Sequence, residues 1–143
     1  MARKLLVVCL GNICRSPMAQ VVLQRELGNG WKVESAGLGA LVGEPAAPEA
    51  LQALARMKLD ATAHRARQLD SERLREAELV LVMETAQKIE VERIYPWACG
   101  RVFLLGHWEG LEIEDPYRCP QEIFDQTLAL IERCAATWRG RLA

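Results

Sequence analysis

The chain has neither an excess of charge of one sign nor a long hydrophobic run. It carries 18 Lys and Arg against 19 Asp and Glu, a formal net charge of −1. We therefore expect no overall positive field and no nucleic-acid partner. No apolar run approaches the roughly 20 residues that span a bilayer, which predicts no membrane insertion. Residues 1–4 lead into an apolar run without a signal-peptide cleavage pattern, so we expect a cytoplasmic protein.

The cysteines and histidines form no metal-binding or disulfide pattern. There are two histidines and five cysteines with no C-x2-C pair, so we expect no metal and no cofactor. An odd cysteine count also argues against a secreted disulfide framework. Cys134 is interpreted as core filler on a helix, and no role is predicted for Cys99 and Cys119. The G-x4-G-K-[S/T] and G-x-G-x-x-G nucleotide-binding loops are absent too.

Apolar runs alternate along the chain with stretches of helical spacing. Half of the 143 residues are hydrophobic, which suits a single domain over residues 1–143. The expected strands are 5–9, 31–35 (an edge strand), 79–83 and 102–105, and the expected helices are 16–27, 48–59, 85–95 and 120–138. This order predicts a doubly wound α/β fold, a parallel sheet flanked by helices. Ligands bind such sheets beyond the carboxyl ends of the strands.

The first expected strand ends in the sequence Cys-Leu-Gly-Asn-Ile-Cys-Arg-Ser-Pro, residues 9–17. Amide N–H groups of a loop between a strand and a helix can converge on one anion, and the helix dipole adds positive charge there. Such a field favours the nucleophilic thiolate form of Cys9. Arg15 can bind two oxygens of a phosphate at once. The pattern therefore predicts a phosphate-binding loop and a cysteine that attacks phosphorus.

The other residues of this motif favour the same interpretation. Gly11 permits close approach of a ligand to the backbone, and Asn12 tolerates positive φ. We expect Ser16 to cap the following helix and Pro17 to occupy its first position. The alternative, on these residues alone, is a buried cysteine at a strand end followed by an ordinary capped helix.

The motif also resembles a known family, the low-molecular-weight protein tyrosine phosphatases. Residues 8–17 match the family signature V-C-x-G-N-I-C-R-S-P throughout. Further matching segments are Ser35-Ala36-Gly37, residues 64–69, residues 79–84 and Asp115-Pro116-Tyr117. The resemblance spans about residues 4–138 and is greatest to the bacterial branch associated with capsule and exopolysaccharide production, on the basis of residues 37–43 and 106–108.

The resemblance implies a four-stranded parallel sheet and a two-step hydrolysis of phosphotyrosine. Cys9 would form a cysteinyl-phosphate, while Arg15 and the amides of the loop hold the phosphate oxygens. Asp115 would protonate the leaving phenolate and then activate water. The alternative for Asp115 is an ordinary acid in a surface turn. The phosphate-binding loop comprises Leu10, Gly11, Asn12, Ile13, Cys14 and Arg15.

The remaining site residues have supporting roles by the same resemblance. Ser16 would donate a hydrogen bond to the Cys9 thiolate, and Asn12, Ser35 and His64 would hold the shape of the loop. Leu41 and Tyr117 would wall the pocket. Eukaryotic members carry an aromatic residue near Leu41 and a second tyrosine at the position of Arg118, so the peptide preference stays open. The implied partner is a phosphotyrosine protein, a bacterial tyrosine autokinase, and the oligomeric state is unknown.

Two enzyme classes and one binding class remain as alternatives. An arsenate reductase of this fold uses a closely spaced cysteine pair in mid-chain, and Cys99 and Cys119 stand too far apart to match it. Family members that act on phospho-arginine carry Thr where this chain has Ile13, and the apolar side chain favours phosphotyrosine. A non-catalytic phosphotyrosine-binding module would keep the loop without turnover. The presence of Cys9, Arg15 and Asp115 together argues against it.

Cys14 lies five residues from Cys9 on the same tight loop. Peroxide oxidises an exposed thiolate first, and a nearby thiol can trap the resulting sulfenic acid as a disulfide. We therefore expect reversible inactivation through a Cys9–Cys14 disulfide. The alternative is that Cys14 only fills space in the loop.

Overall fold

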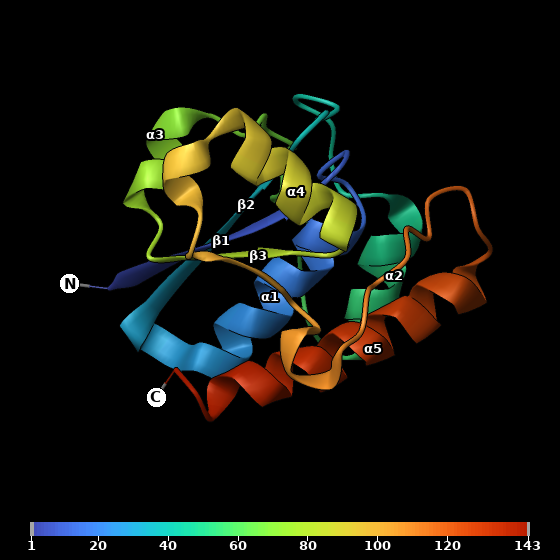
Figure 1. Cartoon of the computed structure of the whole chain (residues 1–143). Helices are drawn as coiled ribbons and strands as arrows, with labels where there is room; N and C mark the ends of the chain where they lie inside the picture. The colour runs from blue at the N-terminus through green and yellow to red at the C-terminus, as the bar shows by residue number, and fades with distance from the viewer. Residues whose placement is uncertain (1, 143) are drawn as a thin grey trace.

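A four-stranded parallel sheet runs through the centre of the computed structural model, which describes residues 2–142 (Figure 1). The strands are β1 (Arg3–Cys9), β2 (Trp31–Gly37), β3 (Leu79–Val82) and β4 (Val102–Leu104). Their order in the sheet is β2-β1-β3-β4, and each neighbouring pair is parallel. The predicted sheet and the predicted edge position of β2 are confirmed.

Helices cover both faces of this sheet, as the doubly wound prediction requires. They are α1 (Arg15–Leu27), α2 (Pro48–Arg56), α3 (Ser71–Glu76), α4 (Thr85–Ile94) and α5 (Gln121–Arg139), with 3₁₀ turns at Gly28–Gly30, Pro96–Ala98 and His107–Glu109. In Figure 1, α1, α2 and α5 lie on one side of the sheet, and α3 and α4 on the other. Among residues 2–142, no helix has the length and apolar character needed to cross a bilayer.

Strand β1 explains why the sheet is buried on both sides. Leu5, Val7 and Cys9 point into the larger apolar core with α1 and α5, whereas Leu6 and Val8 point into a smaller one on the opposite face. Alternate residues of a strand face opposite sides of the sheet, so a strand buried on both sides is apolar throughout. Cys9, at the carboxyl end of β1, is thereby held at the sheet edge where ligands bind.

The start of α1 differs from the sequence prediction. The helix begins at Arg15, Cys14 occupies the cap position without a side-chain hydrogen bond, and Ser16 and Pro17 lie inside the first turn. The prediction that Ser16 caps this helix and that Pro17 is its first residue was therefore wrong. The physical reason is that the Ser16 hydroxyl bonds to Cys9 and Asn12.

The loop at residues 38–47 is tied to the phosphate-binding loop by backbone hydrogen bonds. The amides of Leu38, Gly39, Leu41 and Ala47 donate to the carbonyls of Cys9, Leu10, Gly11 and Ile13. These bonds run at 2.8–3.1 Å. At its start, a side chain on Gly37 would place Cβ only 2.4 Å from the Leu10 carbonyl oxygen, so only glycine permits this approach.

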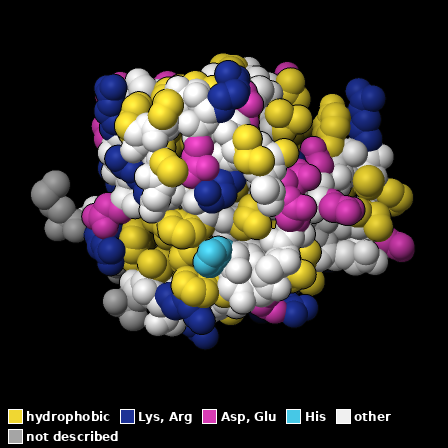
Figure 2. All heavy atoms as spheres, in the orientation of Figure 1, with side chains coloured by type: hydrophobic (Ala, Val, Ile, Leu, Met, Phe, Trp, Pro, Cys, Tyr) yellow, Lys and Arg dark blue, Asp and Glu magenta, His cyan; other side chains and the backbone are white. Residues whose placement is uncertain are grey.

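Charged side chains of both signs are interspersed over the face shown in Figure 2. Many of them are paired, for example Arg133 with Glu109 and Lys88 with Glu92. Charges of both signs on this face accord with the net charge of −1.

Candidate active site

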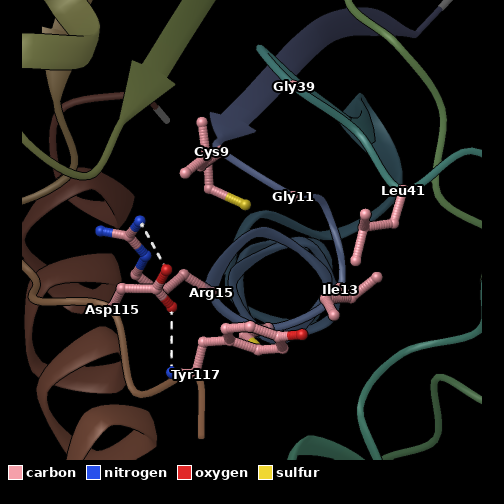
Figure 3. A pocket seen from close by; sticks show the side chains of 10 residues that line it. Cys9, Gly11, Ile13, Arg15, Gly39, Leu41, Asp115 and Tyr117 are labelled. Atoms are coloured by element: carbon pink, nitrogen blue, oxygen red, sulfur yellow. Dashed lines mark hydrogen bonds and ion pairs between the residues drawn. The ribbon is translucent and has the colours of Figure 1, made fainter.

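A pocket of about 180 Å³ lies beyond the carboxyl end of β1. Its lining comprises Cys9, Leu10, Gly11, Ile13, Cys14, Arg15, Gly39, Leu41, Asp115 and Tyr117. Figure 3 shows the Cys9 side chain turned toward the centre of the loop that follows it. The structure thus brings the predicted nucleophile, arginine, acid and wall residues into one cavity, although they come from three separate segments of the chain.

The sulfur of Cys9 lies in a chain of buried hydroxyl and amide groups. Cys9 Sγ and Ser16 Oγ are 2.8 Å apart, and Asn12 Nδ2 donates to the same Ser16 oxygen at 2.7 Å. Because Ser16 accepts from Asn12, its own proton is available to donate to the sulfur.

Asn12 is the centre of the support behind the loop. Besides Ser16, its amide donates to Ser35 Oγ at 3.1 Å, and its Oδ1 accepts from the Arg67 backbone N–H at 2.9 Å. Ser35 in turn donates to Gln20 Oε1 at 2.6 Å. The backbone of Asn12 has a φ of 59°, the left-handed conformation that the sequence pattern predicted. Every polar atom of this side chain is therefore engaged in holding the loop.

His64 joins the same support from outside the pocket. Its Nε2 lies 2.7 Å from the Asn12 carbonyl oxygen. A carbonyl only accepts, so His64 carries its proton on Nε2 and donates it. Burial is the main cause of a lowered pKa for His64, which favours the neutral ring. The structure places Ser35 and His64 behind the loop, as the resemblance implied, rather than in the pocket.

The guanidinium of Arg15 is buried, and NH1 is hydrogen-bonded to the protein whereas Nε is not. Its NH1 donates to Glu84 Oε1 and, at 2.7 Å, to the Ile113 carbonyl oxygen. Its side chain is 2% exposed, and Nε has no hydrogen-bond partner among the protein atoms of the described residues. The Nε–NH2 edge of the fork therefore remains available for two parallel bonds to phosphate oxygens.

Glu84, Gln20 and Arg67 are the residues of this site that sequence reasoning missed. Glu84 is the cap residue of α4 and fixes Arg15 from the opposite side of the sheet. Glu84 lies in one of the segments that resemble the family, but the neighbouring sequence does not indicate that it pairs with an arginine 69 residues away. Gln20 carries a weak signal, because it lies four residues after Ser16 on the same face of α1.

The predicted acid, Asp115, and one wall residue, Tyr117, come from the loop before α5. Asp115 Oδ2 is 3.6 Å from Arg15 NH2, and Asp115 Oδ1 accepts from the Tyr117 backbone N–H at 3.1 Å (Figure 3). The Asp115 side chain is 37% exposed. Ile13, Leu41 and the Tyr117 ring surround the mouth with apolar surface. The cavity therefore has a polar floor for an anion and an apolar mouth for a ring.

Cys14 also lines the pocket but differs from Cys9 in its surroundings. Burial raises the pKa of the Cys14 thiol to about 12, and the nearby Asp115 carboxylate adds to this shift. Cys14 is therefore a neutral thiol at physiological pH. All five cysteines are unpaired.

Comparison with known proteins identifies the family. Residues 4–143 match the sequence model of the low molecular weight phosphotyrosine protein phosphatases. The chain belongs to this family. It is 46% identical to EpsP of Ralstonia solanacearum over 142 residues, which cover 99% of this chain and 97% of that protein. The predicted family and its bacterial branch are confirmed, and this phosphatase is an enzyme of the protein tyrosine phosphatase class.

Solved structures agree on the fold of this phosphatase. The tyrosine phosphatase Wzb from Escherichia coli K30, in complex with sulphate, superposes with a TM-score of 0.94 at 38% identity and full coverage of both chains. The YwlE arginine phosphatase from Geobacillus stearothermophilus superposes with a TM-score of 0.93 at 31% identity, over 98% of this chain and 92% of that one. Because an arginine phosphatase has the same fold, the choice of substrate depends on the residues of the pocket.

Proposed function

We propose that this phosphatase hydrolyses phosphotyrosine in proteins through a cysteinyl-phosphate formed on Cys9. The observation that carries the proposal is the position of Cys9 Sγ, which lies 2.8 Å from Ser16 Oγ. Cys9 shares its pocket with Arg15, whose Nε has no hydrogen-bond partner among the described residues. A nucleophile and a guanidinium edge facing one cavity suit attack on a phosphate that the guanidinium holds.

In the first step, Cys9 Sγ attacks phosphorus and the bond from phosphorus to the tyrosine oxygen breaks. Asp115 gives its proton to the departing phenolate, which leaves as neutral tyrosine. Arg15 and the amides of residues 10–15 neutralise the charge on the three equatorial oxygens. The products of this step are cysteinyl-phosphate and a dephosphorylated tyrosine.

In the second step, water attacks the cysteinyl-phosphate while the Asp115 carboxylate takes its proton. The bond between phosphorus and sulfur breaks, and Cys9 leaves as a thiolate. The Ser16 hydroxyl stabilises this leaving group through its hydrogen bond. Inorganic phosphate is released, and Asp115 is protonated for the next cycle.

The mouth of the pocket supports phosphotyrosine over phospho-arginine. Ile13, Leu41 and the Tyr117 ring present apolar surface at the mouth of the pocket. An apolar wall favours a phenyl ring and leaves the donors of a guanidinium without acceptors.

We propose a bacterial tyrosine autokinase that controls exopolysaccharide or capsule production as the protein substrate. This rests on the resemblance to the bacterial branch and on the identity of 46% to EpsP. The five unpaired cysteines support a reducing compartment, the cytoplasm, as the place of action.

One assay with three substrates tests the proposal. The purified enzyme, in EDTA and without added metal, is given p-nitrophenyl phosphate, a phosphotyrosine peptide and a phospho-arginine peptide, with Cys9→Ser as the control. We expect turnover of the first two, and a clear preference for phosphotyrosine over phospho-arginine. Binding of the phosphotyrosine peptide without release of phosphate would instead indicate a binding module. Thiol-dependent reduction of arsenate, without peptide hydrolysis, would indicate an arsenate reductase.

A further inference from the structure

Exposed apolar side chains gather around the mouth of the catalytic pocket. Among the described residues, eight large apolar side chains are exposed: Leu10, Leu41, Val42, Ile89, Ile94, Trp97, Trp108 and Tyr117. Five of these line either the catalytic pocket or one of two grooves that open into it, namely Leu10, Leu41, Val42, Ile94 and Tyr117. Contiguous exposed apolar surface of this kind marks an interaction site.

The first groove, here the loop groove, lies between residues 41–49 and Tyr117. Its volume is about 690 Å³, and Val42 and Pro45 contribute to its apolar wall. It shares Ile13, Leu41 and Tyr117 with the catalytic pocket, so the two cavities adjoin. Val42 is 69% exposed, which leaves most of its side chain available to a ligand.

The second groove, here the helix groove, lies between the phosphate-binding loop and α4. Its volume is about 630 Å³, and Leu10, Leu38, Ala86 and Ile94 contribute to its apolar lining. Leu10, Arg15, Gly39 and Asp115 line both this groove and the catalytic pocket. The pocket for the phosphate therefore lies between two apolar grooves.

Charge at the rims restricts what these grooves accept. Glu44 and Glu49 line the loop groove, and Glu84 and Glu90 line the helix groove. Arg118 also lines the loop groove, where its guanidinium lies 5.3 Å from the centre of the Tyr117 ring. With Asp115, three carboxylates line the helix groove, and two line the loop groove. They disfavour an acidic side chain next to the phosphotyrosine.

An extended polypeptide fits this arrangement. In an extended chain, the residues two positions before and after a given residue point to the same side as that residue. We propose that the substrate crosses the mouth as an extended strand, with the phosphotyrosine in the catalytic pocket. Apolar side chains two residues before and two residues after it then occupy the loop groove and the helix groove. This inference rests on the proposed function and adds the class of sequence around the phosphotyrosine.

Four phosphotyrosine peptides test it, with leucine or serine at each of the two flanking positions. The measured quantity is kcat/KM for each peptide, divided by kcat/KM of the same enzyme for p-nitrophenyl phosphate. For the natural chain, we expect the peptide with two leucines to exceed the peptide with two serines by about 100-fold. This is roughly tenfold per groove, the low end for loss of one apolar contact in a binding pocket.

Two variants link each flanking residue to one groove. Val42→Ser should lower the ratio for one of the two single-leucine peptides and leave the other unchanged. Ile94→Ser should lower the ratio for the other single-leucine peptide and leave the first unchanged. Ile89→Ser is the matched control, because Ile89 lies on α4, is 61% exposed and lines neither groove. It should change no ratio.

Two results would overturn the inference. One is equal ratios for all four peptides in the natural chain; the other is a loss with Val42→Ser or Ile94→Ser that does not depend on which position carries leucine. If the enzyme hydrolyses none of the peptides and no p-nitrophenyl phosphate, the proposed function itself is wrong. Hydrolysis of p-nitrophenyl phosphate and all four peptides at one common rate contradicts the inference alone.

Discussion

The two sides of the phosphate-binding loop are built in opposite ways. Behind the loop, Asn12, Ser16 and Ser35 are fully buried, and each makes at least two hydrogen bonds. In front of it, Val42 and Tyr117 are exposed apolar side chains at the mouth. A buried polar network has one satisfied arrangement, whereas an exposed apolar rim accepts different partners. We therefore expect the inner side to set the reaction and the outer side to set the choice of substrate sequence.

The largest effect expected on the inner side is that of Cys9→Ser. A serine hydroxyl is a much weaker nucleophile than a thiolate, so turnover should fall below detection. Arg15 and the amides remain, so binding of phosphate or vanadate should persist. Release of phosphate and isothermal titration with vanadate measure the two properties separately. Appreciable hydrolysis by this variant would contradict the mechanism.

The next effect is that of Asp115→Asn, which removes the proton donor and keeps the acceptor of the Tyr117 N–H. We expect kcat for phenyl phosphate to fall by roughly 10²–10⁴, the usual contribution of acid–base catalysis. The loss should be smaller for p-nitrophenyl phosphate, whose leaving group needs little protonation. Equal losses for both esters would mean that Asp115 does not donate the proton.

Substitutions of Asn12 on the inner side should lower the stability of the fold more than a substitution on the outer side. Asn12→Gly keeps the positive φ but removes three buried side-chain hydrogen bonds, which should lower the free energy of unfolding by about 2–3 kcal/mol. Asn12→Ala should cost about 1 kcal/mol more, because alanine disfavours positive φ. Val42→Ser on the outer side should stay within about 0.5 kcal/mol of the natural chain. Urea unfolding measures the free energy of unfolding of all three variants. Equal losses would contradict the expected difference in stability between the inner and outer sides.

Oxidation tests the role of Cys14. Peroxide oxidises Cys9 to a sulfenic acid, and attack by Cys14 Sγ then forms the disulfide and releases water. Because the pKa of Cys14 is raised to about 12, this trapping should be slow at pH 7 and faster at pH 9. Phosphate should slow the oxidation, and Cys14→Ser should make recovery with dithiothreitol less complete. Peptide mapping that finds Cys9 only as sulfinic or sulfonic acid, with Cys14 still free, would exclude the resolving role.

The smallest effect is a pH dependence of stability from His64. Burial lowers the pKa of His64 in the folded state below its usual 6.5, so protonation favours unfolding. Its contribution is complete above about pH 6.5 and is lost as the pH falls below that value. His64→Gln keeps a donor toward the Asn12 carbonyl without the titration. The Tm of the natural chain should therefore fall more steeply than that of the variant between pH 6.5 and 5, and parallel curves would contradict this.

Local patterns were enough to predict the sheet and much of the pocket. The apolar run 5–9 predicted a strand buried on both faces, and residues 9–17 predicted the loop at its end. The family resemblance was needed to bring Asp115 to the same pocket, since 100 residues separate it from Arg15.

The errors and omissions lie where distant residues compete with local signals. Ser16-Pro17 is a common helix start, but the contact of Ser16 with Cys9 displaced the start of α1 to Arg15. The anchoring of Arg15 by Glu84 and the Ile113 carbonyl joins residues 69 and 98 positions apart. No periodicity or capping rule refers to such pairs, which follow only from the order of the strands.

The unpartnered Nε of Arg15 has a consequence for the balance between substrate and product. A buried donor without an acceptor costs free energy, and any phosphate dianion that enters the pocket removes this cost. In the proposed mechanism, substrate, cysteinyl-phosphate and released phosphate would all satisfy the same donor. The part of this bond that is equal in all three would contribute uniform binding and would not by itself raise kcat. We therefore expect inorganic phosphate to inhibit competitively, so that the rate of the enzyme depends on the concentration of its own product.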